Sequence, residues 1–68
     1  MSVFARRLKE LRIDKGMSIQ SLSRAIKIGS SSLSRWENDQ ADVKGSQLII
    51  LAKFFDVTTD YLLGLQDL

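Results

Sequence analysis

The sequence contains neither cysteine nor histidine. The absence of cysteine excludes disulfides and thiol nucleophiles, and the absence of histidine excludes zinc fingers and every mechanism that uses imidazole as a base or a ligand. The acidic side chains that remain are scattered and form no catalytic constellation. We therefore expect a protein that is not an enzyme and that carries no metal and no cofactor.

The chain also lacks a long apolar run at its start. It begins Met-Ser-Val-Phe-Ala and reaches Arg6 and Arg7 before a segment of signal-peptide or membrane-spanning length can form. We therefore expect a cytoplasmic protein with no membrane association. Its 68 residues suffice for one small domain, residues 1–68, with a modest core.

Charge is distributed unevenly along the chain. Residues 1–35 contain eight Lys and Arg against two acidic residues, a net charge of +6, whereas residues 36–68 carry a net charge of −4. A polyanion would bind the N-terminal half most favourably. Charge alone leaves open the alternative of an ordinary mixed surface.

Helical periodicity and capping residues predict an all-α chain. Small capping residues precede apolar residues at helical spacing, Gly16 and Gly64 are expected to end the first and last helices, and Ser46 is expected to cap the fourth. The predicted helices span residues 2–15, 18–26, 29–38, 46–55 and 59–63. The second and third helices begin eleven residues apart, which is the spacing of a helix-turn-helix.

The apolar residues of these helices predict one common core. Its expected members are Phe4, Leu8, Leu11, Leu22, Ala25, Ile26, Leu33, Trp36, Leu48, Leu51, Ala52, Phe55, Val57 and Leu62.

The third predicted helix has the composition of a helix that enters the major groove of DNA. Such a helix needs short side chains at its N-terminal end and one or two long ones that reach base edges. Leu33 and Trp36 should face inward. The candidate base-reading residues lie away from that stripe: Ser30, Ser31, Ser34 and Arg35. The alternatives are a capping, solvent-facing serine cluster and, for Arg35, a phosphate contact or a free surface charge.

Residues 17–38, MSIQSLSRAIKIGSSSLSRWEN, resemble the helix-turn-helix of the Cro and lambda-repressor-like family, also called the XRE family. The Ser18 cap, the step from Leu22 to Leu33 and the run Trp36-Glu37-Asn38 follow that family's pattern, and residues 57–64 are similar to its closing helix. The resemblance covers nearly the whole chain. It implies a compact five-helix domain that binds double-stranded DNA.

Three positions depart from the family pattern. Lys27 replaces the usual glycine of the turn, so it must accept a left-handed backbone, at a cost of about 1 kcal/mol, or reshape the turn. Ile19 replaces a glutamine that commonly touches phosphate, and Gly29 replaces the usual Ser or Thr cap of the third helix.

The resemblance also implies contacts outside the third helix. It supports Ser18 and Asn38 as phosphate-binding residues, while Gln20, Lys27 and Lys44 are candidates from their charge or position. Relatives often pair an Arg late in the first helix with the Glu that follows the bulky residue of the third. Arg12 and Glu37 occupy these positions, and the alternative is two exposed charges of little energetic value.

The fourth helix has more apolar residues than one core stripe can bury. Ile50 and Phe54 lie four residues apart on a neighbouring face, within reach of Tyr61, Leu65 or Leu68. Exposed apolar area of this kind usually marks an interface, so we expect a homodimer. The alternative is a C-terminal tail that folds back over Ile50 and Phe54 within one chain.

The sequence thus predicts a transcriptional repressor that binds a roughly palindromic operator as a dimer. The alternative function is a protein-interaction adaptor that has the same fold and does not read DNA, because a fold does not fix a function.

Overall fold

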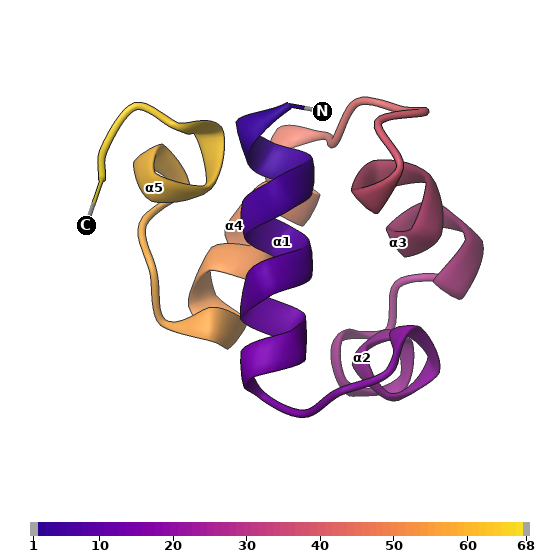
Figure 1. Ribbon diagram of the computed structural model, residues 1–68. Coiled ribbons are helices and arrows are strands. Elements are labelled where there is room, and N and C mark those ends of the chain that lie inside the picture. The colour runs from indigo at the N-terminus through magenta and orange to yellow at the C-terminus, as the bar shows by residue number, and fades with distance from the viewer. Residues whose placement is uncertain (1, 68) are drawn as a thin grey trace.

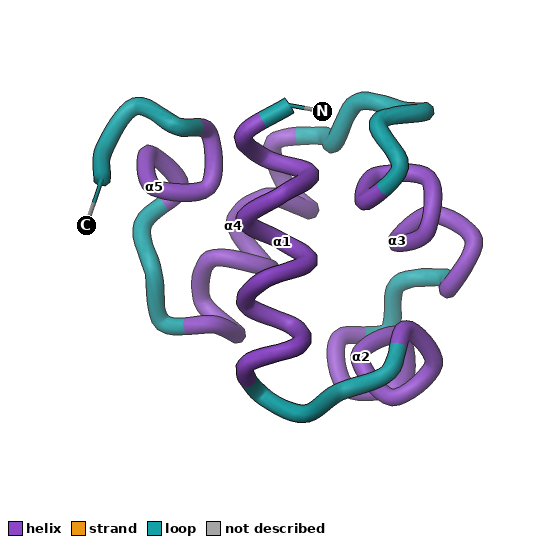
Figure 2. Tube along the Cα trace, in the orientation of Figure 1, coloured by secondary structure: helices purple, strands orange, loops and turns teal. Residues whose placement is uncertain are grey.

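The computed structural model describes residues 2–67, and within that range it contains five α-helices and no strand (Figures 1 and 2). The helices are α1 (Val3–Asp14), α2 (Ile19–Ile26), α3 (Ser30–Glu37), α4 (Gly45–Phe55) and α5 (Thr59–Leu63). The expected all-α, five-helix architecture is confirmed. Leu68, one of the residues expected near the fourth helix, lies outside the described residues.

Hydroxyl side chains cap three of the five helices at their N-termini. Ser2 accepts a hydrogen bond from the Ala5 N–H at 3.1 Å, and Ser18 and Thr58 do the same at the starts of α2 and α5. The expected cap at Ser46 is wrong. Helix α4 begins at Gly45 with Lys44 as its N-cap, because the Gln47 side chain accepts a hydrogen bond from the Lys44 N–H at 3.4 Å and extends the first turn backwards.

Left-handed residues end three of the helices. Gly64 has φ +83° at the end of α5, and Asp56 has φ +55° at the end of α4. Lys27 ends α2 with φ +60° and ψ +40°, so it accepts the left-handed conformation and the turn keeps its shape. Its N–H donates to the Ser23 carbonyl at 2.8 Å, and the Ser23 hydroxyl donates to the Ile28 carbonyl.

The core joins all five helices. Each helix contributes one fully buried leucine: Leu8, Leu22, Leu33, Leu51 and Leu62. Helix α1 packs against α3 on one side and α5 on the other, and α2 packs against α3 and α4 (Figure 1). Helices α2 and α3 therefore form one flank of the molecule, opposite α5.

Two details of the predicted core are different in the structure. Ala25 is exposed, because the short helix α2 buries only the stripe that contains Leu22 and Ile26. Ala5 and Ile28 are buried and were not among the expected residues. Ala5 lies one turn before Leu8 on the same face of α1, and Ile28 follows the left-handed Lys27 in the turn.

No helix in residues 2–67 combines the length and the apolar content that a membrane span requires.

Candidate nucleic-acid interface

Helices α2 and α3 and the turn between them bring all the candidate DNA-contacting residues except Asn38 and Lys44 onto one flank of the molecule. The turn contains only Lys27, Ile28 and Gly29, and the two helices pack directly against each other. An open hollow lies between their N-terminal ends, lined by Ile19 and Gln20 from α2 and by Ser30, Ser31 and Ser34 from α3. The short serine side chains leave the first turn of α3 open to close approach by a ligand.

Arg35 is the long side chain of this flank. It is exposed, as is Ser31 one turn earlier on the same face of α3. Within residues 2–67 no hydrogen bond or ion pair engages its guanidinium. Ser30 and Ser34 are partly buried where α3 meets α2. Arg35 is therefore free to donate hydrogen bonds to a bound molecule, and the serines surround a recess beside it.

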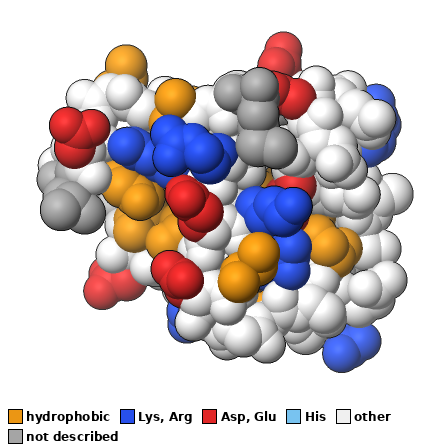
Figure 3. All heavy atoms as spheres, in the orientation of Figure 1, with side chains coloured by type: hydrophobic (Ala, Val, Ile, Leu, Met, Phe, Trp, Pro, Cys, Tyr) orange, Lys and Arg blue, Asp and Glu red, His pale blue; other side chains and the backbone are white. Residues whose placement is uncertain are grey.

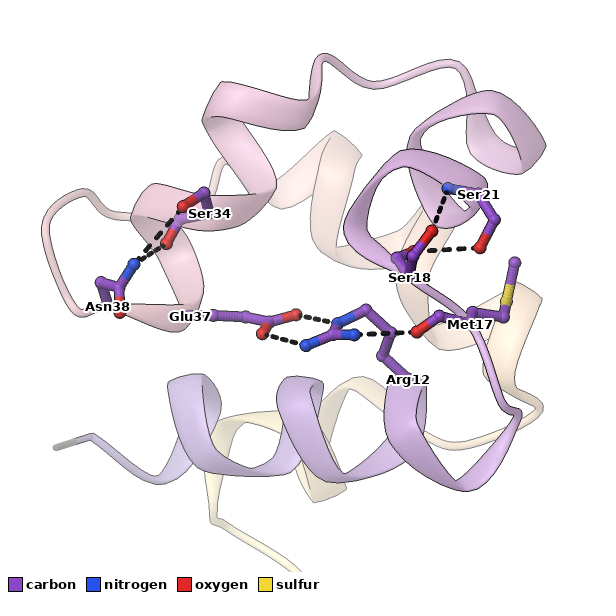
Figure 4. Close-up of polar contacts among 7 residues, drawn as sticks. All are labelled: Arg12, Met17, Ser18, Ser21, Ser34, Glu37 and Asn38. Atoms are coloured by element: carbon purple, nitrogen blue, oxygen red, sulfur yellow. Dashed lines mark hydrogen bonds and ion pairs between the residues drawn. The ribbon is translucent and has the colours of Figure 1, made fainter.

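The hydroxyl of Ser18 retains a proton that it can donate. Its oxygen accepts from the Ser21 N–H at 3.0 Å, and the Ser21 hydroxyl donates to the Ser18 carbonyl at 3.0 Å (Figure 4). Since a serine hydroxyl has one donor and two acceptor positions, the Ser18 O–H can still bind an anion next to the first amides of α2. Gln20 lies two residues later and is exposed at the hollow.

Asn38 is held at the end of α3. Its side-chain amide donates to the Ser34 carbonyl at 2.9 Å and contacts the Ser34 hydroxyl at 3.4 Å (Figure 4). Lys27 is exposed in the turn beside α3. Lys44 is also exposed, but it lies at the start of α4, after the loop that follows α3. The structure thus gathers Ser18, Gln20 and Lys27 around α2 and leaves Lys44 on a separate element.

Arg12 and Glu37 tie this flank to α1. The Arg12 Nε donates to Glu37 Oε2 at 2.8 Å, its Nη2 donates to Oε1 at 3.0 Å, and its Nη1 donates to the Met17 carbonyl at 2.8 Å (Figure 4). The hydrogen bond to Glu37 raises the pKa of Arg12 above its ordinary value. One guanidinium therefore joins α1, the segment that enters α2, and the end of α3.

Arg7 is a second arginine with a structural role, and the sequence analysis did not predict that role. Its guanidinium lies 4.2 Å from the centre of the Tyr61 ring, donates to the carbonyls of Tyr61 and Gln66, and approaches the Asp67 carboxylate at 3.6 Å. These partners lie more than fifty residues away in the sequence, so no local pattern signals them. Arg7 holds the C-terminal segment against α1.

These contacts reduce the number of basic side chains in the N-terminal half that are available to a ligand. Arg7 and Arg12 are engaged inside the fold, and Arg6 pairs with Glu10 at 3.6 Å on the surface. On the face shown in Figure 3, basic and acidic side chains are interspersed. The basic side chains that remain exposed on the α2 and α3 flank are Arg24, Lys27 and Arg35. The helix-turn-helix therefore keeps exposed positive charge for a polyanion, and Lys9 and Lys15 on α1 are exposed as well.

The residues expected at a self-association surface have different environments. Ile50 is 41% exposed and Leu65 is 75% exposed. Phe54 is partly buried, packs edge-on against Phe55 at 5.1 Å and has the Lys15 ammonium 4.9 Å from its ring centre. The Tyr61 ring lies beneath Arg7.

The C-terminal segment does not follow the alternative path over Ile50. Arg7 holds residues 66 and 67 at α1, and Ile50 stays open to solvent beside Ile49, which is 50% exposed. The described tail therefore leaves an apolar patch on α4 uncovered.

Comparisons with known proteins agree with this fold. The family model described as helix-turn-helix matches residues 8–62. The HTH-type transcriptional regulator ImmR of Bacillus subtilis is 37% identical over 59 residues, which cover 87% of this chain and 46% of ImmR. The uncharacterized HTH-type transcriptional regulator YobD of the same organism is 34% identical over 65 residues, which cover 96% of this chain and 58% of YobD.

A third relative is the HTH-type transcriptional activator BcrR of Enterococcus faecalis. It is 29% identical over 65 residues, which cover 96% of this chain and 32% of BcrR. The chain thus spans between about a third and three-fifths of the length of these relatives.

Proposed function

This chain belongs to the helix-turn-helix family, of the Cro and lambda-repressor-like (XRE) type, and on that premise we propose that residues 1–68 are a DNA-binding domain that reads the sequence of a double-stranded operator. The family and its named relatives are transcriptional regulators and not enzymes. The observation that carries the proposal is the state of Arg35: an exposed guanidinium with no partner among residues 2–67, on a helix that begins with short serines.

Arg35 reads a base and Ser30, Ser31 and Ser34 line the approach to it. A guanidinium on such a helix can donate two hydrogen bonds to O6 and N7 of a guanine, which is the commonest specific contact in the major groove. The serines keep the helix end narrow, so α3 can lie deep enough for Arg35 to reach the base edge.

Residues before, between and after helices α2 and α3 bind the DNA backbone. Ser18 and Gln20 bind phosphate at the start of α2, where the first amides of the helix also point outward. Lys27 in the turn, Asn38 at the end of α3 and Lys44 at the start of α4 contribute further phosphate contacts. The two lysines contribute an electrostatic part of the affinity that is independent of sequence.

Two copies bind a roughly palindromic operator and repress transcription. The exposed Ile49 and Ile50 on α4 support self-association, since contiguous exposed apolar area favours an interface. A two-fold dimer presents two α3 helices to successive major grooves, about 34–36 Å apart. A dimer on a promoter excludes polymerase, and repression follows.

Activation is the second candidate function, favoured by the similarity to the transcriptional activator BcrR.

Salt-titrated binding to selected DNA tests the proposal. Sequences are enriched from a random duplex pool with the folded chain, and Kd is then measured at several salt concentrations for the enriched site and for a scrambled duplex of equal length. We expect the enriched site to contain two related half-sites and to bind at least about 10³ times more tightly than the scrambled duplex. The logarithm of the affinity should fall with the logarithm of the salt concentration, with a slope of about −0.9 per phosphate contact. Failure to enrich any sequence, together with salt-independent affinity for a protein partner, would establish the adaptor instead.

A further inference from the structure

Ile19 is an apolar side chain at the mouth of a polar hollow. It is the first residue of α2, and part of it packs against the core. The rest of the side chain lines the hollow between α2 and α3 together with Gln20, Ser30, Ser31 and Ser34. Among the described residues that line the hollow, Ile19 is apolar and the others are polar. The hollow therefore has an apolar wall and a rim of short hydroxyls.

The hollow lies beside the proposed base-reading residues. Ser31 and Ser34 belong both to its rim and to the flank of α3 that carries Arg35. A base pair whose edge meets this part of α3 therefore also meets Ile19. The Ser34 hydroxyl accepts a hydrogen bond from the Asn38 amide at 3.4 Å and keeps its own proton for a contact at the rim of the hollow.

An isoleucine side chain can neither donate nor accept a hydrogen bond, so a partner must offer it apolar surface. The exposed edges of the bases in the major groove consist of donors and acceptors, with one apolar exception: the C5-methyl group of thymine. The same methyl group occurs in 5-methylcytosine.

We propose that the hollow of Ile19, Ser30, Ser31 and Ser34 receives the C5-methyl group of a thymine in each half-site, and that Ile19 is a specificity-determining residue. This inference rests on the proposed function, because it needs α3 to lie in the major groove. It adds a second readout to that of Arg35: one side chain reads a purine by hydrogen bonds, and the other reads a pyrimidine by its methyl group.

Methyl deletion in the DNA tests the inference directly. Each thymine of the enriched operator is replaced in turn by deoxyuridine, which lacks only the methyl group, and Kd is measured for the parent chain and for Ile19→Val and Ile19→Ala. In the parent we expect one thymine per half-site at which the replacement weakens binding about fourfold, as for the loss of one buried methyl group. That ratio should shrink in Ile19→Val and approach one in Ile19→Ala.

Partial unfolding of a variant does not affect the ratio of Kd values for the thymine and deoxyuridine operators. Thymine and deoxyuridine operators are measured with the same preparation of each variant, so a reduced folded fraction cancels in the ratio of the two Kd values. Ile13→Ala is the matched control, because Ile13 is 55% exposed on α1 and lines a hollow with Tyr61 on the side away from α2. It should leave the fourfold ratio unchanged.

The possible outcomes are distinct. A thymine-to-deoxyuridine ratio that stays near fourfold in Ile19→Ala shows that Ile19 does not read the methyl group and overturns the inference, while the proposed function stands. Absence of any enriched operator removes the proposed function itself. At the sensitive position, a 5-methylcytosine pair should bind more tightly than a cytosine pair by a similar ratio, but less tightly than the thymine pair. Tighter binding of 5-methylcytosine than of thymine overturns the assignment to thymine.

Discussion

The guanidinium of Arg12 and the carboxylate of Glu37 meet through two parallel hydrogen bonds of 2.8 and 3.0 Å, although only 13% and 6% of the two side chains are exposed. Charges taken out of water in this way are stabilising only while each has its partner. The pair links α1 to the end of α3, so it fixes how the exposed face of α3 is presented.

Removing one member of this pair should destabilise the fold strongly. For Arg12→Ala or Glu37→Ala we expect a loss of unfolding free energy well above the roughly 0–1 kcal/mol of an exposed pair, toward the roughly 3–5 kcal/mol reported for broken buried pairs. The double variant should recover part of the loss. Thermal and denaturant unfolding measure the effect.

The chain contains a matched control for this double-mutant cycle. Arg6 and Glu10 form an ion pair at 3.6 Å, but 52% and 57% of their side chains are exposed. Their alanine variants should change stability by less than about 1 kcal/mol. Strictly additive losses at Arg12 and Glu37, or losses no larger than at the control pair, contradict a coupled buried pair.

Arg35 should control specificity more than general affinity. Arg35→Ala should weaken binding to the enriched operator by about 1–3 kcal/mol and weaken binding to scrambled DNA much less, because a base contact is lost. Lys27 gives the contrast, since a phosphate contact contributes to every sequence. Titrations of both duplexes at one salt concentration separate the two roles. A uniform loss for Arg35→Ala across all sequences would assign Arg35 to phosphate.

Replacing Lys27 by glycine should raise stability and lower affinity together. Lys27 has φ +60°, a conformation that costs a side-chain-bearing residue about 1 kcal/mol and a glycine very little. Lys27→Gly should therefore stabilise the fold by up to about 1 kcal/mol, and it should flatten the salt dependence of DNA binding by about one phosphate contact. Lys27→Asn, which also tolerates this conformation, is the control for the added flexibility of glycine. Unchanged or lower stability in both variants would show that the turn is not strained.

Prediction from the sequence succeeded where the signals are local. Ser18 and Thr58 cap helices because a short hydroxyl before an apolar stripe has few other roles, and Gly64 ends α5 because its backbone is left-handed. Ser46 misled because the Gln47 side chain moved the start of α4 back to Gly45. Ala25 was wrongly predicted to be buried, because spacing alone does not reveal how narrow the buried stripe of a short helix is.

Long-range contacts mark the limit of such reasoning. The sequence offers no signal for the contact of Arg7 with Tyr61 and Gln66, because the partners come from opposite ends of the chain. The positions of Arg12 and Glu37 pointed to an ion pair only through the family resemblance. The hollow beside Ile19 depends on the angle between two helices, so it is visible only in the folded chain.

Arg7 should fix the C-terminal segment. Arg7→Lys keeps the charge but loses the forked hydrogen bonds to two carbonyls and the planar contact with the Tyr61 ring. We expect faster hydrogen exchange at the Leu65 amide, which donates to the Asp60 carbonyl at 2.8 Å, and unchanged exchange in α3. Arg6→Lys is the control, since Arg6 is exposed and pairs with Glu10 on α1. Equal exchange at Leu65 in both variants contradicts the role of Arg7.

The exposed apolar patch on α4 should carry self-association. Ile50→Asp places a charge on a side chain that is 41% exposed, so the monomer should stay folded while the interface loses its apolar contact. Phe54 is left unchanged, because it packs against Phe55 and its loss would disturb the core. Sedimentation velocity and operator titration measure the outcome. We expect weaker self-association and loss of cooperative binding to two half-sites, with binding to a single half-site retained.

Ile13→Asp is the control for this prediction, since Ile13 is 55% exposed on α1. If Ile50→Asp and the control leave cooperativity equally intact, two copies meet through another surface; if both variants abolish it, general loss of apolar surface and not this patch is the cause.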